Sequence, residues 1–226
     1  MPGDPTESLS PAQRRSLETV LALLAEERAS VSSVTDDRAW QVHVADSLTG
    51  LEVPELRKAR RIADVGAGAG FPGLVLAVTL PEAQIDLIDS ISRKTAFITR
   101  AAEEAQIPNA TALTTRAEDL ARTEARESYD VVTSRAVGRI STLAELASPL
   151  LREGGVLVAW KGRRDAEEEA QMDRAAAELA MTPERILDVG HRAGSEHRHL
   201  HVIRKSGPTP SNLPRKPGLA KKRPKG

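Results

Sequence analysis

The sequence predicts an α/β fold with a mostly parallel sheet, an antiparallel hairpin at one sheet edge and a helical segment in front. From Arg61 onward, short runs rich in β-branched residues alternate with longer helical patterns, as strand–helix–strand crossovers between parallel strands require. The last two runs are joined only by Gly190 to His199. Because so short a connection cannot cross over the sheet, these two runs are expected to pair as a hairpin.

The N-terminal part of the chain, residues 1–57, predicts a helical preface rather than a separate domain. Ser10, Pro11 and Gln13 fit an N-cap, a first helical residue and a capping-box partner, so a helix should begin here. Its apolar stripe, at three- and four-residue spacing, consists of Leu17, Val20, Leu21 and Leu24. A second helix is expected to end near Gly50 and to contain Trp40, Val44 and Leu48.

The sheet domain is expected to span residues 58–205, followed by a tail over residues 206–226. Its expected strands, in chain order, are Ile62–Val65, Ile85–Ile88, Thr111–Thr114, Tyr129–Thr133, Val156–Trp160, Arg185–Val189 and Leu200–Arg204. Its expected helices are Gly73–Leu80, Ile91–Gln106, Ile140–Leu151 and Asp165–Ala180.

Length and composition suit one α/β domain with short additions, since 226 residues with 40% hydrophobic content can bury a sizeable core. The sequence has no apolar run of membrane-spanning length and no secretory signal, so we expect a cytoplasmic protein. The absence of cysteine excludes disulfides, thiolate metal ligands and a Cys nucleophile. We expect no bound metal.

Charge is divided unevenly, although the whole chain is formally neutral. Residues 206–226 hold six of the 32 basic residues and no acid, which leaves 26 basic against 32 acidic residues in the rest. Five prolines argue against a helix in this tail, so we expect it to be disordered, or to bind nucleic-acid phosphates in extended form. Its candidate RNA-binding residues are Arg215, Lys216, Lys221, Lys222 and Arg223.

A glycine-rich loop follows the first expected strand, where residues 62–73 read I-A-D-V-G-A-G-A-G-F-P-G. Gly66, Gly68 and Gly70 can take positive φ angles and let a ligand approach the bare backbone. The free N–H groups of the following helix are expected to point at that ligand. The pattern is therefore typical of a nucleotide-binding loop.

A dinucleotide is one ligand that fits this loop. Gly68, Gly70 and Gly73 satisfy the pattern G-x-G-x-x-G, which dinucleotide-binding proteins use to approach a pyrophosphate. Asp89 lies 21 residues beyond Gly68, near the place where such proteins have a ribose-binding acid. Taken alone, this match is weak evidence for a dinucleotide.

Three features favour S-adenosylmethionine instead. Counted from Gly66, directly after the strand, the final glycine of the dinucleotide pattern is replaced by Phe71. Asp64 stands inside the strand, where dinucleotide-binding proteins have apolar residues, and their six-stranded fold has no C-terminal hairpin. An acid, a glycine loop and a second acid after the next strand are expected of the Rossmann-like S-adenosylmethionine-dependent methyltransferase fold.

In that fold Asp89 would accept hydrogen bonds from the ribose hydroxyls, although it could instead cap a helix that begins near Ser90 and Ser92. Arg116 to Asp119 follow the third strand, where such enzymes recognise the amino edge of adenine. The alternative role for this acidic segment is the first turn of a helix.

The type of acceptor atom is narrowed by what the sequence lacks. Methylation of pyrimidine C5 needs a Cys nucleophile, and this sequence has no cysteine. Methylation of an exocyclic amine typically needs an [N/D]-P-P-[Y/F] motif after the fourth strand, where Val132 to Gly138 contain neither proline nor an aromatic residue. A ring nitrogen such as guanine N7 already has a lone pair and needs no base. The sequence therefore permits ring-nitrogen methylation, and small-molecule O-methylation with a His or Lys base or a metal stays open.

Three side chains are candidates for positioning the reactants. Arg135 ends the fourth strand and would face the cofactor crevice, where it could pair with the methionine carboxylate or an RNA phosphate; a surface arginine is the alternative. Lys161 ends the next strand and is similarly aimed; the alternative is a lysine whose aliphatic stem packs on the protein while its ammonium group lies in solvent. His43 lies in the segment H-V-A-D-S-L, where a structural role is favoured over a functional one.

These residues resemble one family closely, the RsmG (GidB) family of bacterial 16S rRNA guanine-N7 methyltransferases. The matching segments are H-V-A-D-S-L (His43–Leu48), D-V-G-A-G-A-G-F-P-G (Asp64–Gly73), L-I-D-S (Leu87–Ser90), R-A-E (Arg116–Glu118), S-R-A (Ser134–Ala136), W-K-G (Trp160–Gly162) and T-P-S-N-L-P-R-K-P-G (Thr209–Gly218). The glycine pattern alone is generic, whereas its continuation F-P-G together with S-R-A and the basic tail is specific.

The resemblance implies an S-adenosylmethionine-dependent enzyme that methylates N7 of a single guanosine, position 527, in 16S rRNA. It implies 16S rRNA or the 30S subunit as partner, and we expect a monomer. The implied cofactor contacts are Gly66, Phe71, Ala117, Glu118 and Arg135, to which the residues themselves add Gly68, Gly70 and Asp89. Two departures lie in the preface: Ala29 to Val34 lack the family's N-L-T segment, and Val42 stands where the family has an arginine.

Two other functions stay open from the sequence alone. One is a small-molecule methyltransferase with an inert tail, and the other is a sensor that binds a nucleotide and RNA without turnover. If the tail is an RNA-binding arm, removal of residues 206–226 should weaken RNA binding and reduce its salt dependence while leaving cofactor affinity intact.

Overall fold

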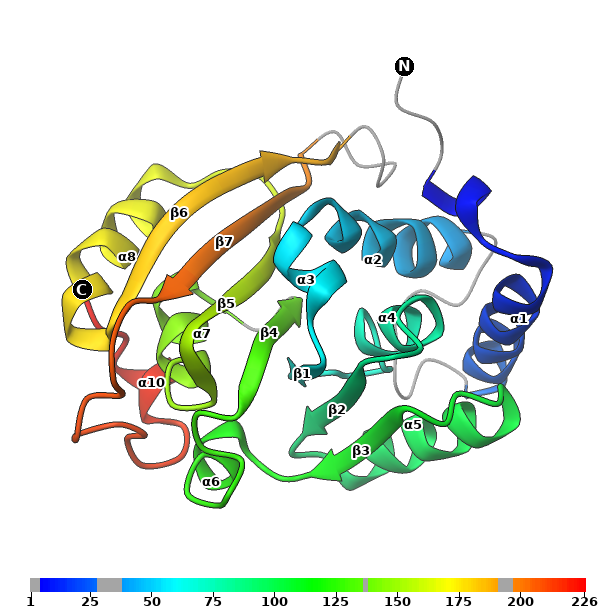
Figure 1. Cartoon of the computed structure of the whole chain (residues 1–226), viewed down its shortest axis with the longest axis horizontal. Helices are drawn as coiled ribbons and strands as arrows, with labels where there is room; N and C mark the ends of the chain where they lie inside the picture. The colour runs from blue at the N-terminus through cyan, green and yellow to red at the C-terminus, as the bar shows by residue number, and fades with distance from the viewer. Residues whose placement is uncertain (1–4, 28–37, 136–137, 191–196) are drawn as a thin grey trace.

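The computed structural model describes residues 5–27, 38–135, 138–190 and 197–226, and in these residues one sheet of seven strands lies between two layers of helices (Figure 1). The strands are β1 (Arg61–Val65), β2 (Gln84–Asp89), β3 (Ala110–Thr114), β4 (Tyr129–Arg135), β5 (Leu151–Lys161), β6 (Met181–Asp188) and β7 (His199–Lys205). The helical segments are η1 (Pro5–Ser8), α1 (Pro11–Glu26), η2 (Trp40–Ala45), α2 (Asp46–Leu48), η3 (Thr49–Glu52), α3 (Pro54–Lys58), α4 (Gly73–Thr79), α5 (Ser92–Glu104), α6 (Ala117–Leu120), α7 (Ile140–Ala147), α8 (Ala166–Leu179) and α10 (Leu219–Lys222).

The strand order is β3-β2-β1-β4-β5-β7-β6. The first five strands in this order are parallel, and β7 pairs antiparallel with both β5 and β6, so the predicted parallel sheet with an antiparallel edge hairpin is confirmed. Along the chain, β2 and β3 are added on one side of β1, and the later strands, beginning with β4, are added on its other side. Ligands of such sheets bind at this switch point, outside the carboxyl ends of the strands.

Strand side chains alternate between two hydrophobic cores. On β5, Val156 and Val158 pack with α1 to α5 on one face, and Leu157 and Ala159 pack with α6, α7 and α8 on the other. Each central strand is thus buried on both faces, as expected of a parallel sheet covered by crossover helices. None of the described helices is both long enough and apolar enough to cross a membrane.

The predicted strands and helices are present, and the main differences lie at their ends. β5 begins at Leu151 rather than Val156, because Leu151 pairs with Tyr129 ahead of a register shift. α7 ends at Ala147 rather than Leu151, since Pro149 follows its last turn. β6 extends back to Met181 and accommodates Pro183 at an irregularity in its pairing with β7.

The preface follows the prediction in α1 and departs from it afterwards. Ser10 Oγ accepts a hydrogen bond from Gln13 N, and Gln13 Oε1 accepts one from Ser10 N, which completes the predicted capping box. The single helix expected around Trp40 is instead a π-helical segment, one turn of α-helix and a 3₁₀ turn, η2, α2 and η3. A side chain at Gly50 would lie 2.5 Å from the Trp160 ring, which explains the glycine there. Ala29 to Val34 lie outside the described residues.

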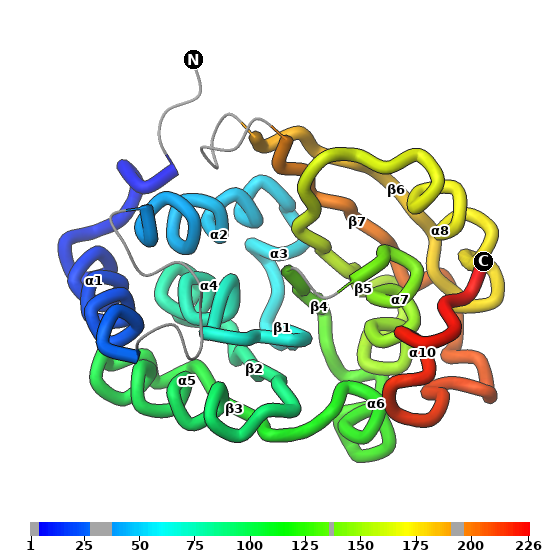
Figure 2. Tube along the Cα trace, turned by 180° about the vertical axis from the view of Figure 1, so that it is seen from behind, coloured from blue at the N-terminus to red at the C-terminus, as the bar shows by residue number. Residues whose placement is uncertain are grey.

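The C-terminal residues 206–226, which we name the C-terminal strap, are folded against the domain, so the expectation of disorder is wrong. Figure 2 shows them beside α6 and α7. Leu213 and Ala220 are buried, and one helical turn, α10, fits between Pro217 and Pro224 despite the prediction that prolines exclude a helix. At the start of the strap the buried Lys205 donates to Thr209 Oγ1 and to Ser148 O, both at 2.6 Å.

Candidate active site

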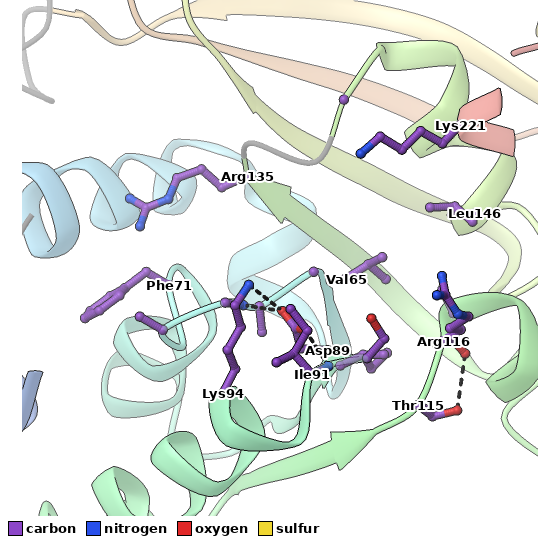
Figure 3. A pocket seen from close by; sticks show the side chains of 18 of the residues that line it. Val65, Phe71, Asp89, Ile91, Lys94, Thr115, Arg116, Arg135, Leu146 and Lys221 are labelled. Carbon is purple, nitrogen blue, oxygen red and sulfur yellow. Dashed lines mark hydrogen bonds and ion pairs between the residues drawn. The ribbon is translucent and has the colours of Figure 1, made fainter. Parts of the chain in front are cut away.

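A cavity of about 730 Å³ lies at the carboxyl ends of β1, β2 and β4, where the topology places a ligand site (Figure 3). This volume is typical of a small-molecule or cofactor pocket. Seven of the eight predicted cofactor contacts line it, namely Gly66, Gly68, Phe71, Asp89, Ala117, Glu118 and Arg135. The eighth, Gly70, does not line it. The cavity is also lined by His43 from the preface and Lys221 from the strap.

The glycine loop opens toward this cavity at Gly68. Gly68 has a φ of 58°, and a side-chain carbon there would meet only Gly66 O, at 3.9 Å, so the space above it is free for a ligand. Gly70 has a φ of 90° and a different reason for being glycine, because a side chain there would collide with Leu74 of α4 at 2.5 Å. Gly68 is thus needed for the approach of a ligand, and Gly70 is needed for packing against α4.

The amide groups of the loop are largely engaged within the protein. Gly68 N donates to Asp89 Oδ2 at 3.0 Å, and Gly73 N donates to Asp64 Oδ2 at 2.9 Å. Gly66 and Ala67 donate to Ile88 O, Gly70 and Phe71 to Ala67 O, and Leu74 to Gly70 O. The expectation that α4 offers free N–H groups is therefore wrong at Gly73 and Leu74. Because these N–H groups already donate to acceptors within the protein, the loop is poorly suited to binding a pyrophosphate, which argues against a dinucleotide.

Asp64 is a buried acid beneath the loop. Its Oδ1 accepts a hydrogen bond from Thr133 Oγ1 at 3.0 Å, and its Oδ2 accepts the one from Gly73 N. Burial raises the pKa of Asp64 to about 6, against the lowering effect of these two donors. The carboxyl group thereby joins β1, β4 and the first turn of α4, and it fixes the shape of the loop.

Asp89 ends β2 and faces the cavity. Its Oδ2 accepts from Gly68 N, its Oδ1 accepts from Ile91 N at 2.9 Å, and Lys94 Nζ lies 3.5 Å from Oδ2. The two predicted roles are therefore compatible, because the carboxylate holds the entry to α5 while its oxygens keep lone pairs for ribose hydroxyls. Figure 3 shows the Lys94 side chain beside Asp89.

Arg135 joins three segments that are far apart in the sequence. Its Nη1 donates to Val42 O and to Asp46 Oδ2, each at 2.9 Å, and its Nη2 lies 3.2 Å from His43 Nδ1. The His43 ring stacks on Phe71, with ring centroids 4.5 Å apart and an interplanar angle of 13°. Arg135 is thus no surface arginine, and the segments around His43, Phe71 and Arg135 form one wall of the cavity.

Asp46 is the centre of that wall. Its side chain is 2% exposed, and besides Arg135 it has Arg198 Nε 2.7 Å from its Oδ1. The Trp160 indole N–H donates to the Asp46 carbonyl at 3.0 Å. Asp46 therefore fastens the preface to β4, to β5 and to the residues before β7.

The adenine-side segment after β3 is both helical and part of the cavity. Ala117–Leu120 forms α6 with Glu118 and Asp119 in its first turn, so the alternative helical role also holds. Glu118 is buried, and its Oε1 accepts a hydrogen bond from Gly218 N of the strap at 2.7 Å. The strap therefore touches the site at one of its predicted cofactor residues.

Comparison with known proteins decides the family. The family model described as rRNA small subunit methyltransferase G matches residues 14–200, which is most of the chain. The chain belongs to this family. Curated members include the ribosomal RNA small subunit methyltransferase G of Bacillus subtilis, 36% identical over 221 residues, with 96% of this chain and 92% of that protein covered. The one from Gloeobacter violaceus is 37% identical over 218 residues, with 95% and 87% covered.

A solved structure supports the methyltransferase fold expected of this family. The O-methyltransferase from Bacillus cereus in complex with SAH has a TM-score of 0.59 and 14% identity. The alignment covers 88% of this chain and 94% of that one. The predicted Rossmann-like S-adenosylmethionine-dependent methyltransferase fold is confirmed.

Lys161 does not line the cavity, so the prediction that it is aimed like Arg135 is wrong. Its Nζ donates to Glu168 Oε1 at 2.7 Å and to Gly138 O at 2.8 Å. The same Glu168 oxygen accepts from Ile140 N at 2.7 Å. Because side chains alternate along a strand, Lys161 points toward α7 and α8, on the other side from Trp160.

The predicted RNA-binding residues of the strap separate into two groups. Arg215 is an anchor, since its Nε donates to the buried Glu145 Oε1 at 2.6 Å and its Nη2 donates to Arg223 O. The other four candidates are exposed, and their side chains form no ion pair with any described residue: Lys216, Lys221, Lys222 and Arg223. Of the five, Lys221 is the one that lines the cavity.

Sequence reasoning gave no role to Asp46 or Glu145. Asp46 was noted only as part of the segment H-V-A-D-S-L, and the sequence does not show that it pairs with Arg135, which lies 89 residues away. Glu145 lies in an apolar helix and meets Arg215 across 70 residues. A charged residue on an otherwise buried helix face was the available signal, because such a residue needs a partner.

Proposed function

We propose that this protein transfers a methyl group from S-adenosylmethionine to N7 of a single guanine in 16S rRNA. The observation that carries the proposal is the cavity itself, open above Gly68, walled by Asp89 and built on the methyltransferase fold of a chain in the rRNA small subunit methyltransferase G family. The engaged loop amides favour S-adenosylmethionine over a pyrophosphate-bearing cofactor.

The residues at the cavity fit S-adenosylmethionine. The free space above Gly68 suits the methionine part, the Asp89 carboxylate suits the two ribose hydroxyls, and Ala117 with Glu118 suits the adenine. When bound, the cofactor supplies an electrophilic methyl group on its sulfonium sulfur. The chain's own work is then to hold the acceptor in line with that methyl group and to exclude water.

The state of the titratable groups at the cavity favours an acceptor that needs no base. Lys94 lies against Asp89, Glu118 accepts a hydrogen bond from the strap, and His43 is held between Phe71 and Arg135. A hydroxyl or phenol acceptor would need one of them as a general base, whereas guanine N7 attacks with its own lone pair. This contrast supports rRNA guanine N7 over small-molecule O-methylation.

The substrate would be 16S rRNA, alone or assembled in the 30S subunit, and we propose that the enzyme acts on it as a monomer in the cytoplasm. The test incubates the protein with methyl-labelled S-adenosylmethionine and undermethylated 30S subunits, with naked 16S rRNA and a catechol in parallel reactions. Label in the rRNA and none in the catechol is the expected result. Label in the catechol alone would favour the small-molecule function, and cofactor binding without transfer would favour the sensor.

A further inference from the structure

Two positive charges at the cavity have no partner among the described residues. Among the described residues that line it, four are lysines or arginines, and two of these form ion pairs within the protein: Lys94 with Asp89, and Arg135 with Asp46. Arg116 and Lys221 are exposed, and neither forms an ion pair within the described part of the chain. In Figure 3, Lys221 extends from α10 over the pocket, on the side where Arg116 and Leu146 lie.

S-adenosylmethionine does not account for these two charges. Its carboxylate is outweighed by an ammonium and a sulfonium group, so the cofactor as a whole is positive, and its ribose and adenine are neutral. Arg116 directly precedes Ala117 and Glu118, the residues that suit the adenine, and Lys221 lies on the same side of the pocket, so the part of the cofactor nearest these two cations has no anion to pair with them. An anion that enters together with the cofactor is the chemically matched partner, and the phosphate groups of an RNA backbone are such anions.

Lys221 is held in place from both sides of α10. Gly218 N, directly before α10, donates to Glu118 Oε1 of α6 at 2.7 Å, and Thr142 Oγ1 of α7 donates to Ala220 O at 3.3 Å. The Ala220 side chain is buried, at 3% exposure. A lysine on a freely moving tail would lose much conformational freedom on binding, whereas the backbone at Lys221 is already fixed.

We propose that the C-terminal strap is a wall of the methyl-transfer site and that Lys221 binds a backbone phosphate of the rRNA beside the target guanine. This inference rests on the proposed function for the identity of the RNA. It assigns different roles to the basic residues of the strap, because Arg215 anchors the strap and Lys221 touches the substrate. Truncation of the strap is no clean test, since it would also remove buried residues and the hydrogen bond to Glu118.

The experiment compares Lys221→Ala with the wild-type protein on undermethylated 30S subunits. A phosphate contact is present both before and during methyl transfer, so its loss should raise KM and leave kcat unchanged. We expect a KM about tenfold higher, as for loss of one charge-assisted hydrogen bond. We also expect the salt dependence of 30S binding to become shallower by about one unit, and the dissociation constant of S-adenosylmethionine to stay unchanged.

Two further variants separate position from charge. Lys58→Ala removes an equal charge at an exposed site just before the amino end of β1, whereas the cavity lies at the carboxyl ends of the strands, and it should leave KM unchanged. Lys221→Arg keeps the charge and should recover most of the lost affinity. Because Lys221 is exposed, neither the fold nor the melting temperature should change in any of these proteins.

The outcomes distinguish the two proposals. Methyl transfer to rRNA by wild type with an unchanged KM for Lys221→Ala would overturn the role of Lys221 and leave the proposed function standing. A raised KM accompanied by an equal loss of cofactor affinity would also overturn it, because Lys221 would then serve the cofactor. If wild type binds 30S subunits without transferring a methyl group, the proposed function fails, and the salt dependence of binding alone decides the role of Lys221.

Discussion

At the scale of single residues, Asp64 correctly indicated the type of cofactor, although its own role is structural. An acid inside a buried strand favoured S-adenosylmethionine over a dinucleotide, and the structure places it beneath the glycine loop rather than in the cavity. Its carboxyl group accepts from Thr133 and Gly73 with no access to solvent. It shapes the cofactor loop without lining the cavity.

The raised pKa of Asp64 has a consequence for stability. The pKa of the carboxyl group is about 6 in the folded protein and about 3.8, the ordinary value of an aspartate, in the unfolded chain, so between these pH values the folded protein binds the additional proton. Its contribution to the free energy of unfolding therefore falls as the pH rises from about 4 to about 6, by about 3 kcal/mol. Asp64→Asn should remove this fall, because the amide does not titrate.

The measurement is chemical unfolding of wild type and Asp64→Asn at closely spaced pH values, with the exposed Asp173→Asn as control. The difference between wild type and Asp64→Asn should change across this window, and that between wild type and the control should not. A difference that stays constant with pH would mean that folding does not raise the pKa of Asp64.

Asp89 carries a separate prediction at this scale. Its carboxylate is the acceptor best placed for the ribose hydroxyls, and it also holds Gly68 N. Asp89→Ala should weaken S-adenosylmethionine binding by about tenfold to a hundredfold, the range expected for loss of hydrogen bonds to a charged acceptor. Isothermal titration calorimetry checks this, with Glu103→Ala as an exposed acidic control. Unchanged affinity in Asp89→Ala would place the ribose elsewhere.

At the scale of elements, the preface is part of the site rather than an appendage. The residues around His43 contact Phe71 after β1 and Arg135 at the end of β4. Sequence motifs named each of these segments, yet nothing in the sequence shows that they meet, since such pairing depends on the completed sheet. The buried Asp46 between Arg135 and Arg198 is what fixes the meeting.

Asp46→Asn is expected to lower stability, because it leaves the half-buried Arg135 and Arg198 without their anion. Breaking a buried ion pair by removing one partner costs about 3 kcal/mol or more. In a domain of this size such a loss lowers the melting temperature by about 10 °C. Differential scanning calorimetry measures it, and a melting temperature within about 2 °C of wild type would show that the pair contributes little.

The strap carries a prediction about coupling between two of its residues. Arg215→Ala removes the partner of the buried Glu145, so the strap should detach and Lys221 should lose its position. We expect Arg215→Ala to raise KM for 30S subunits about as much as Lys221→Ala does. The double variant should then be no worse than either single one, because both remove the same contact.

The coupling is obtained by measuring KM for 30S subunits in wild type, in the two single variants and in the double variant. Effects that multiply in the double variant would show that Arg215 and Lys221 act independently, with the strap held in place by its other contacts. Lys216→Ala is an informative comparison, because Lys216 is exposed and does not line the cavity.

At the scale of the whole molecule, the sequence predicted the sheet, its hairpin and the glycine loop, because strand–helix alternation and loop length are local signals. It failed for the strap, whose prolines and charge have the composition of a solvated tail. The sequence shows that the rest of the chain has an excess of six acids and the strap an excess of six bases, but it does not show which acids the strap contacts. Two of the strap's six bases pair with acids of the rest of the chain, Arg215 with Glu145 and Lys225 with Glu178.

The same limit applies to the site. Sequence spacing located the loop, Asp89 and Arg135, since each ends a strand whose position is readable. It could not separate Lys161, which faces α8, from Arg135, which faces the cavity. That distinction depends on the register of β5 and on the partners that α8 supplies.

The identity of the methylated atom tests the central claim most directly. After reaction with undermethylated 30S subunits, the 16S rRNA is reduced and cleaved by chemistry specific for N7-methylguanine, and the cleavage sites are mapped by primer extension. We expect one new cleavage site, at a single guanine, that depends on both the protein and S-adenosylmethionine. Methyl incorporation into the rRNA without any such cleavage would contradict the assignment of guanine N7.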